Sequence, residues 1–93
     1  MDLIPSEQAV LRQIRELLLQ ASVRTHRFSA LRSRWPALHY GACLAGYVGL
    51  ARKGLIAKSS DERYFSVTNA GLKAMVLIPA RFFANAAGSS GLA

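Results

Sequence analysis

The sequence predicts a mainly helical α+β domain that carries one small β-hairpin. Three observations support this fold class. Apolar residues recur at helical spacing over residues 7–21. Lys53 and Gly54 form a typical helix stop, because glycine reaches the left-handed conformation that closes many helices. Two short runs with strand composition, residues 55–58 and 63–67, then flank the polar sequence Ser-Ser-Asp-Glu.

The first predicted helix spans residues 7–21. Ser6 is its expected N-cap, and Glu7 places a negative charge near the positive end of the helix dipole. The intervening positions are polar, while one broad face carries Val10, Leu11, Ile14, Leu17, Leu18 and Ala21. An amphipathic helix of this kind buries its apolar face against a core.

Residues 22–36 interrupt the helical pattern and then resume it briefly. Phe28, Leu31 and Trp35 are three and four residues apart, which predicts a short helix over residues 26–34. Pro36 disfavours helical geometry at Trp35. We therefore expect a turn between two helices at this point.

The third predicted helix begins between residues 37 and 40 and ends at Lys53. Apolar spacing assigns Cys43, Leu44, Tyr47 and Leu50 to the core. The expected outward set is His39, Tyr40, Ala42, Ala45, Gly46, Gly49, Arg52 and Lys53. Few of these side chains can read base edges, which usually requires Arg, Lys, Asn or Gln.

Small residues recur along this helix at Gly41, Ala45 and Gly49, with the spacing i, i+4, i+8. Each glycine costs roughly 1 kcal/mol of helix propensity relative to alanine, so a packing or contact purpose is expected. Three interpretations are open at this point. They are docking against a helix of another protein, shallow contact with a nucleic-acid groove, and packing inside the domain.

The order of the later elements can be predicted from residues 50–72, whose sequence is LARKGLIAKSSDERYFSVTNAGL. This segment predicts the end of one helix, then a hairpin, then the start of a new helix. Thr68 offers a side-chain oxygen to cap the helix that begins near Asn69. This order corresponds to the second half of a winged helix-turn-helix. The segments L-A-R-K-G-L-I and V-T-N-A-G-L resemble the wing region of bacterial regulators of the MarR and PadR type.

The resemblance implies a winged-helix domain over residues 1–87. It implies that a short strand among residues 22–27 joins the hairpin, and that the helix ending at Lys53 is the recognition helix. It also implies that basic wing residues, Lys58 and Arg63, reach into the minor groove of DNA. Asp61 and Glu62 at the wing tip would repel phosphates unless they pair locally with Arg63 or Lys58.

In the MarR and PadR regulators the terminal helices form a dimer. By this analogy residues 77–87 are the candidate homodimer interface, with Leu77, Phe82 and Phe83 as its apolar contacts. The alternative is that this segment folds back on its own domain. The small residues of 88–93 predict a flexible tail.

The chain carries 12 Lys and Arg against 5 Asp and Glu, which gives a formal net charge of +7. A small basic domain often binds nucleic acid, because neutralising phosphates releases counterions. We therefore expect a transcriptional regulator of bacterial or phage type that binds double-stranded DNA, mainly at phosphates. The candidate DNA contacts are Arg24, Arg27, Arg32, Arg34, His39, Tyr40, Arg52, Lys53, Lys58 and Arg63.

The same charge could instead keep an apolar chain in solution or meet an acidic protein. In this alternative the domain is a winged-helix interaction module, an inhibitor or assembly factor that does not bind DNA. Its partner would contact Gly41, Ala45 and Gly49 together with the aromatic C-terminal segment.

We predict no enzyme, metal or cofactor site. His39 and Cys43 are four residues apart, but Cys43 is assigned to the core and no third catalytic group is evident. Two histidines and one cysteine are too few ligands for a zinc site. The uncharged residues 37–51 are too few to span a membrane. The lone cysteine and the lack of a signal sequence predict a cytoplasmic location.

Overall fold

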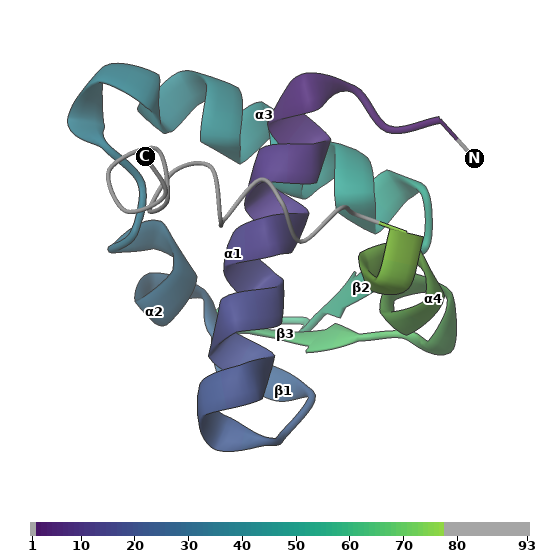
Figure 1. Ribbon diagram of the computed structural model, residues 1–93. Helices are drawn as coiled ribbons and strands as arrows, with labels where there is room; N and C mark the ends of the chain where they lie inside the picture. Colours follow the sequence, from purple (N-terminus) through teal and green to yellow (C-terminus); the bar gives the residue numbers. More distant parts are fainter. Residues whose placement is uncertain (1, 78–93) are drawn as a thin grey trace, which may run out of the picture.

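The computed structural model describes residues 2–77 and forms a helical domain around a small sheet (Figure 1). The elements, in order, are α1 (Pro5–Ala21), β1 (Thr25–Arg27), α2 (Phe28–Arg32), η1 (Ala37–His39), α3 (Tyr40–Arg52), β2 (Ile56–Lys58), β3 (Tyr64–Val67) and α4 (Asn69–Leu77), where η1 is a 3-10 helix. Figure 1 shows α1 crossing α3 with its first turns and the strands with its last. The predicted mainly helical α+β class is confirmed.

The sheet has three antiparallel strands in the order β1-β3-β2. Thr25 of β1 lies opposite Ser66 of β3, and their hydroxyl oxygens are 2.7 Å apart. On the other side of β3, Ile56 pairs with Val67. The third strand expected among residues 22–27 is therefore present, and it ties the chain before α2 to the hairpin.

The start of α1 differs from the prediction, whereas its end at Ala21 agrees with it. The helix begins at Pro5, and the backbone N–H of Ile4 donates to Glu7 Oε1 (3.1 Å), so the predicted Ser6 cap is wrong. Glu7 supplies an acceptor to the free N–H groups of the first turn. At the other end Ser22 adopts the left-handed conformation (φ 58°).

The second helix is shorter than predicted and spans Phe28–Arg32 rather than residues 26–34. His26 and Arg27 instead extend β1, where they lie opposite Phe65 and Tyr64. Pairing with β3 satisfies backbone groups that a longer helix would have used internally. The strand therefore determines where the helix can start.

The glycine stop and the threonine cap occur as predicted. Gly54 has φ 76°, the left-handed conformation that ends α3. The Thr68 hydroxyl oxygen accepts a hydrogen bond from the N–H of Gly71 (3.0 Å) in the first turn of α4. The same hydroxyl lies 2.7 Å from the Gly54 carbonyl oxygen, so the two helix ends are joined.

The core lies between α1, α3 and the inner face of the sheet. Its completely buried large side chains are Val10, Leu11, Ile14, Leu31, Leu50, Leu55, Ile56, Phe65 and Val67. In β2, Ile56 is buried, whereas the neighbouring Ala57 is exposed. Leu44 was assigned to the core but lies at the surface, 36% exposed.

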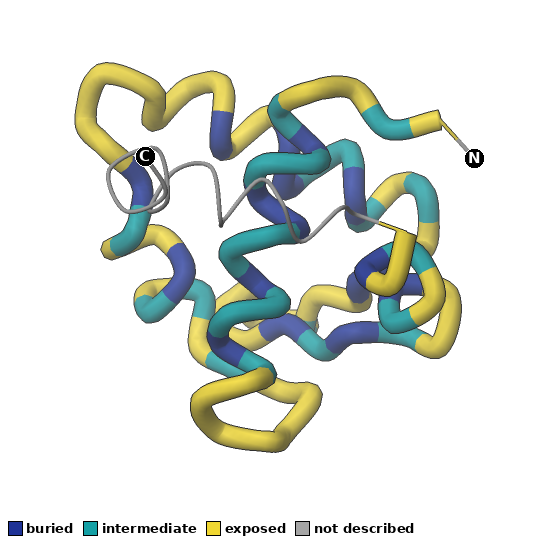
Figure 2. Tube along the Cα trace, viewed as in Figure 1, coloured by how far each residue is buried: buried dark blue, intermediate teal, exposed yellow. Residues whose placement is uncertain are grey.

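Glycines let α1 and α3 approach closely. A Cβ at Gly46 would lie 2.5 Å from the backbone oxygen of Ser6, and one at Gly49 would overlap the Glu7 carboxylate. The outward placement of Gly46 and Gly49 was therefore wrong, because both face α1. The three small residues are therefore divided, since Gly49 packs against Glu7 while Gly41 and Ala45 are exposed. Much of the start of α3 is exposed (Figure 2).

None of the helices within residues 2–77 combines the length and the apolar character that crossing a membrane requires. Leu77, a candidate dimer contact, is 81% exposed at the end of α4. Phe82, Phe83 and the tail at 88–93 lie outside the described residues. The predicted C-terminal interface therefore stays a prediction.

Two alanine substitutions in α3 should have opposite effects on stability. Gly46→Ala should lower the unfolding free energy by about 2 kcal/mol, because its Cβ meets the α1 backbone. Gly41→Ala should raise it by up to about 1 kcal/mol, because a Cβ there has nothing within 4 Å and alanine favours helix. Urea unfolding of both variants measures the difference. Equal effects would contradict the α1–α3 contact.

Candidate nucleic-acid interface

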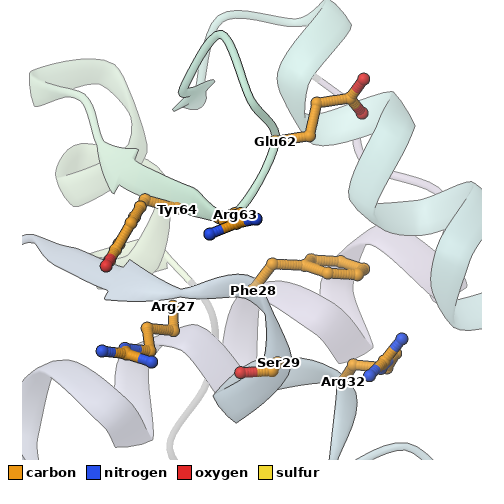
Figure 3. Close-up of a pocket in the computed structure, with 7 residues that line it drawn as sticks. All are labelled: Arg27, Phe28, Ser29, Arg32, Glu62, Arg63 and Tyr64. Carbon is orange, nitrogen blue, oxygen red and sulfur yellow. The ribbon is translucent and has the colours of Figure 1, made fainter.

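Three of the predicted DNA-contacting arginines line one pocket. Arg27 ends β1, Arg32 ends α2 and Arg63 directly precedes β3. The backbone N–H of Phe28 donates to the Arg63 carbonyl oxygen (2.8 Å), which holds the start of α2 against the β2–β3 hairpin. The pocket has a volume of about 400 Å³ and is lined by Arg27, Phe28, Ser29, Arg32, Glu62, Arg63 and Tyr64 (Figure 3).

The guanidinium groups of this pocket are available to an anion. Among residues 2–77, neither Arg27, Arg32 nor Arg63 forms an ion pair with a carboxylate. Arg27 lies over the Tyr64 ring at 5.8 Å from its centroid. Arg32 lies over the Phe28 ring at 5.9 Å. Aromatic support of this kind orders the guanidinium groups while their N–H donors stay available.

Both carboxylates of the turn between β2 and β3, residues 59–63 and the predicted wing tip, have partners within this hairpin. Glu62 Oε1 lies 3.7 Å from Lys58 Nζ, and Figure 3 shows the Glu62 side chain on the opposite side of the pocket from Arg27 and Arg32. Asp61 Oδ1 accepts hydrogen bonds from Ser59 Oγ (2.7 Å) and from the backbone N–H of Arg63 (3.1 Å). We expected these acids to repel phosphates unless they pair with Arg63 or Lys58. Glu62 pairs with Lys58, and Asp61 accepts from the Arg63 backbone, so this requirement is partly met.

These contacts also shape the wing tip. The hydrogen bond from Ser59 and that from the Arg63 backbone lower the pKa of Asp61. Glu62 has φ 59°, a conformation that most side chains avoid. The Asp61 carboxylate accepts hydrogen bonds from Ser59, which precedes Glu62, and from Arg63, which follows it. These two hydrogen bonds close the turn and position Arg63 at the pocket.

Other predicted DNA contacts have partners inside the domain. Arg34 donates to Glu16 Oε1 (2.9 Å) and to Gln20 Oε1 (3.1 Å), which joins the chain after α2 to α1. Lys53 pairs with the buried Glu7 and donates to the Asp2 carbonyl oxygen (2.8 Å). Arg34 and Lys53 thus stabilise helix packing, and their contact with DNA stays a prediction.

The remaining candidates lie at the surface but are spread along the chain. Arg24 donates to Asn69 Oδ1 (2.9 Å), and Arg52, His39 and Tyr40 are exposed. The Tyr40 ring packs against Trp35, with centroids 5.5 Å apart. The structure brings Arg27, Arg32 and Arg63 into one pocket, and it does not bring all ten predicted residues together.

Sequence reasoning missed several residues of this surface. The pocket lining also includes Phe28, Ser29, Glu62 and Tyr64. Phe28, Glu62 and Tyr64 are each next to a predicted arginine, and Ser29 is two positions from Arg27. Leu38, which at 87% is the most exposed large apolar residue within residues 2–77, was also missed. Within residues 37–53, helical spacing places the large apolar residues in the core, so it cannot identify an exposed apolar surface there.

Tyr47 links the wing to α3. Burial, and secondarily the negative charge of Glu62, raise the pKa of Tyr47 to about 12. Its ring lies 4.7 Å from that of Phe28 in the pocket lining. The wing tip, the pocket and the middle of α3 are therefore neighbours.

The catalytic and metal alternatives gain no support within residues 2–77. Cys43 is buried, and burial raises the pKa of its thiol, while His39 is exposed. No group of three His, Cys, Asp or Glu residues among the described positions could hold a metal ion. Comparison of the chain with protein-family models, curated proteins and solved structures gave no match.

Lys53→Met should destabilise the domain. Removing the ammonium leaves the Glu7 carboxylate, of which only 5% is exposed, without its cation. Because Lys53 itself is 30% exposed, the loss should be about 2 kcal/mol, below the full value for a buried pair. Thermal and urea unfolding measure it against Lys73→Met, an exposed lysine of α4. A loss no larger than in the control would contradict a structural role.

The wing tip should loosen at acidic pH. Because the pKa of Asp61 is depressed below its ordinary value of 3.8, its stabilising contribution is fully present above that value. The contribution is lost as the pH falls through the lowered pKa. The Arg63 amide proton, followed by NMR, should therefore shift with a midpoint below 3.8, and Asp61→Asn should abolish the shift. A midpoint at or above 3.8 would contradict this geometry.

Proposed function

We propose that the domain is a winged helix-turn-helix that binds double-stranded DNA, mainly through phosphate contacts. The element order α1-β1-α2-α3-β2-β3 and the strand order β1-β3-β2 support this proposal. In such a domain α2 and α3 form the helix-turn-helix and residues 59–63 form the wing tip. The observation that carries the functional proposal is the pocket with Arg27, Arg32 and Arg63, none of them ion-paired among residues 2–77.

The chemistry of these side chains suits a phosphodiester. A guanidinium group is permanently charged and presents several N–H donors in one plane, which matches phosphate oxygens. Arg27 and Arg32 approach from one side of the pocket and Arg63 from the wing (Figure 3). Arg52 and Arg24 are further exposed cations outside the pocket, and the wing adds Lys58 near Glu62.

We further propose a transcriptional regulator of bacterial or phage type that acts as a homodimer. The net charge of +7 favours encounter with DNA, since neutralised phosphates release counterions. The resemblance of the wing to MarR and PadR regulators supports the same class. Dimerisation through Leu77, Phe82 and Phe83 is part of this proposal.

A second candidate function is that of a protein-binding module without DNA affinity. The observation that favours it is the exposed apolar surface at the start of α3, where Leu38 is 87% and Leu44 36% exposed. Exposed apolar patches often mark protein interaction sites. Measurement of duplex binding at low salt separates the two candidates.

Alanine substitution of the pocket arginines should weaken DNA binding and its salt dependence. For each phosphate contact removed, the slope of log affinity against log salt should become less steep by roughly 0.9. The variants are Arg27→Ala, Arg32→Ala and Arg63→Ala, measured with a fluorescent duplex over a range of salt concentrations. The triple variant should lose roughly 2.7 from the slope.

Lys73→Ala is the matched control, because it removes one positive charge from an exposed site on α4. Its slope should stay close to that of the native protein. Equal effects of Lys73→Ala and Arg63→Ala would show that only net charge matters, and would remove the pocket from the interface. No duplex binding at low salt would refute the DNA-binding proposal.

A further inference from the structure

The exposed face of α3 is apolar where a DNA-reading helix usually carries polar side chains. Cys43, Tyr47 and Leu50 are buried on the side that faces the core. On the opposite side, spaced three and four residues apart, lie Gly41, Leu44, Ala45, Val48 and Arg52. Leu38 of η1, the element that directly precedes α3, is 87% exposed. We call Leu38, Leu44, Ala45 and Val48 the apolar face.

The chemistry of the apolar face limits what it can recognise in a major groove. Hydrogen-bonded readout of guanine or adenine uses Arg, Lys, Asn or Gln, and α3 offers only Arg52, at its last position. The thymine C5-methyl is the one base-edge group in the major groove that is recognised by apolar contact. An aliphatic surface on this helix therefore favours thymine over the other bases.

The apolar face is connected to the cationic pocket. Phe28, which lines the pocket, contacts Trp35 edge to face at 5.6 Å, and Trp35 contacts Tyr40 at 5.5 Å. Tyr40 begins α3, so the guanidinium groups and the start of the apolar face are linked by successive ring contacts. Gly41 leaves space beside this face, since a Cβ at this position would meet nothing within 4 Å.

Charge identifies the occupant of the apolar face. The apolar face has no acidic residue, and the linked pocket holds three arginines that form no ion pair among residues 2–77. On a chain of net charge +7, this combination is complementary to a polyanion that has methyl groups between its charges. A second copy of this chain would bring the same positive charge to the contact. Duplex DNA with thymine in the major groove provides both the phosphates and the methyl groups.

We propose that α3 recognises thymine C5-methyl groups in the major groove through its apolar face, so that the preferred duplex is rich in thymine on the contacted strand. This inference rests on the proposed DNA-binding function and specifies its substrate. The pocket arginines hold the phosphates. Leu44 and Ala45, near the middle of the face, contact the methyl groups, and Arg52 marks its C-terminal end.

Removing only the methyl group tests the proposal. Binding of the full chain is measured to the alternating duplex poly(dA-dT) and to its deoxyuracil counterpart, which keeps the same pairing and the same O4 acceptor. Affinity should fall roughly fourfold for each methyl contacted, from the free energy of burying one such group. The salt slope should not change, because both duplexes carry the same phosphates.

A second duplex pair removes the influence of A·T geometry. Alternating poly(dG-dC) is compared with the same polymer containing 5-methylcytosine, which places the same C5-methyl in the major groove. The methylated duplex should bind more tightly by a similar factor. In both duplex pairs, Leu44→Ala should reduce the ratio of the affinity with the methyl group to the affinity without it. Leu19→Ala, at an exposed leucine of α1, should leave both ratios unchanged.

The outcomes distinguish this inference from the function on which it rests. Equal affinity for the methylated and unmethylated duplexes, with the salt slope intact, would overturn methyl recognition and leave DNA binding in place. If a folded Leu44→Ala variant keeps the native ratio of affinities for the methylated and unmethylated duplexes, the assignment of methyl recognition to the apolar face is overturned. If no duplex binds at low salt, both proposals fail and the apolar face fits a protein partner instead.

Discussion

The packing of α1 against α3 is the contact on which the exposed surface depends. Gly46 and Gly49 remove side-chain volume from α3 where it meets Ser6 and Glu7. Glu7 in turn caps the start of α1 and pairs with Lys53 at the end of α3. Because these contacts fix the rotation of α3 about its own axis, they decide which of its residues face the core. Leu44 and Ala45 are exposed for this reason.

The sheet provides the second constraint. Pairing of β1 with β3 places Arg27 beside the wing, although 36 positions of sequence separate it from Arg63. The Phe28 to Arg63 backbone hydrogen bond then continues the ladder into α2. As a result, arginines from a strand end, a helix end and a hairpin surround one pocket. No local sequence pattern contains that arrangement.

Ion pairing distinguishes two groups of cations among the predicted DNA contacts. Arg34, Lys53 and Lys58 have carboxylate partners within the domain, and two of these pairs join separate elements. Arg27, Arg32 and Arg63 have aromatic or backbone contacts, and none of the three is ion-paired within residues 2–77. The proposed DNA contacts follow from this division, since a cation without an internal carboxylate is available to a phosphate. Net charge alone does not distinguish the groups.

Local sequence determined the elements whose causes are local. The apolar period of α1, the left-handed Gly54 and the Thr68 cap each depend on residues within one turn, and each occurs as predicted. Charge and composition also identified the arginines as candidate contacts. Only the tertiary structure decided which arginines meet, where α2 begins and which side of α3 is buried. Those features depend on strand pairing, on helix contact at Gly46 and Gly49, and on ion pairs between distant residues. Spacing along the chain cannot encode them, because it assigns an apolar residue such as Leu44 to the core whether or not a partner is there.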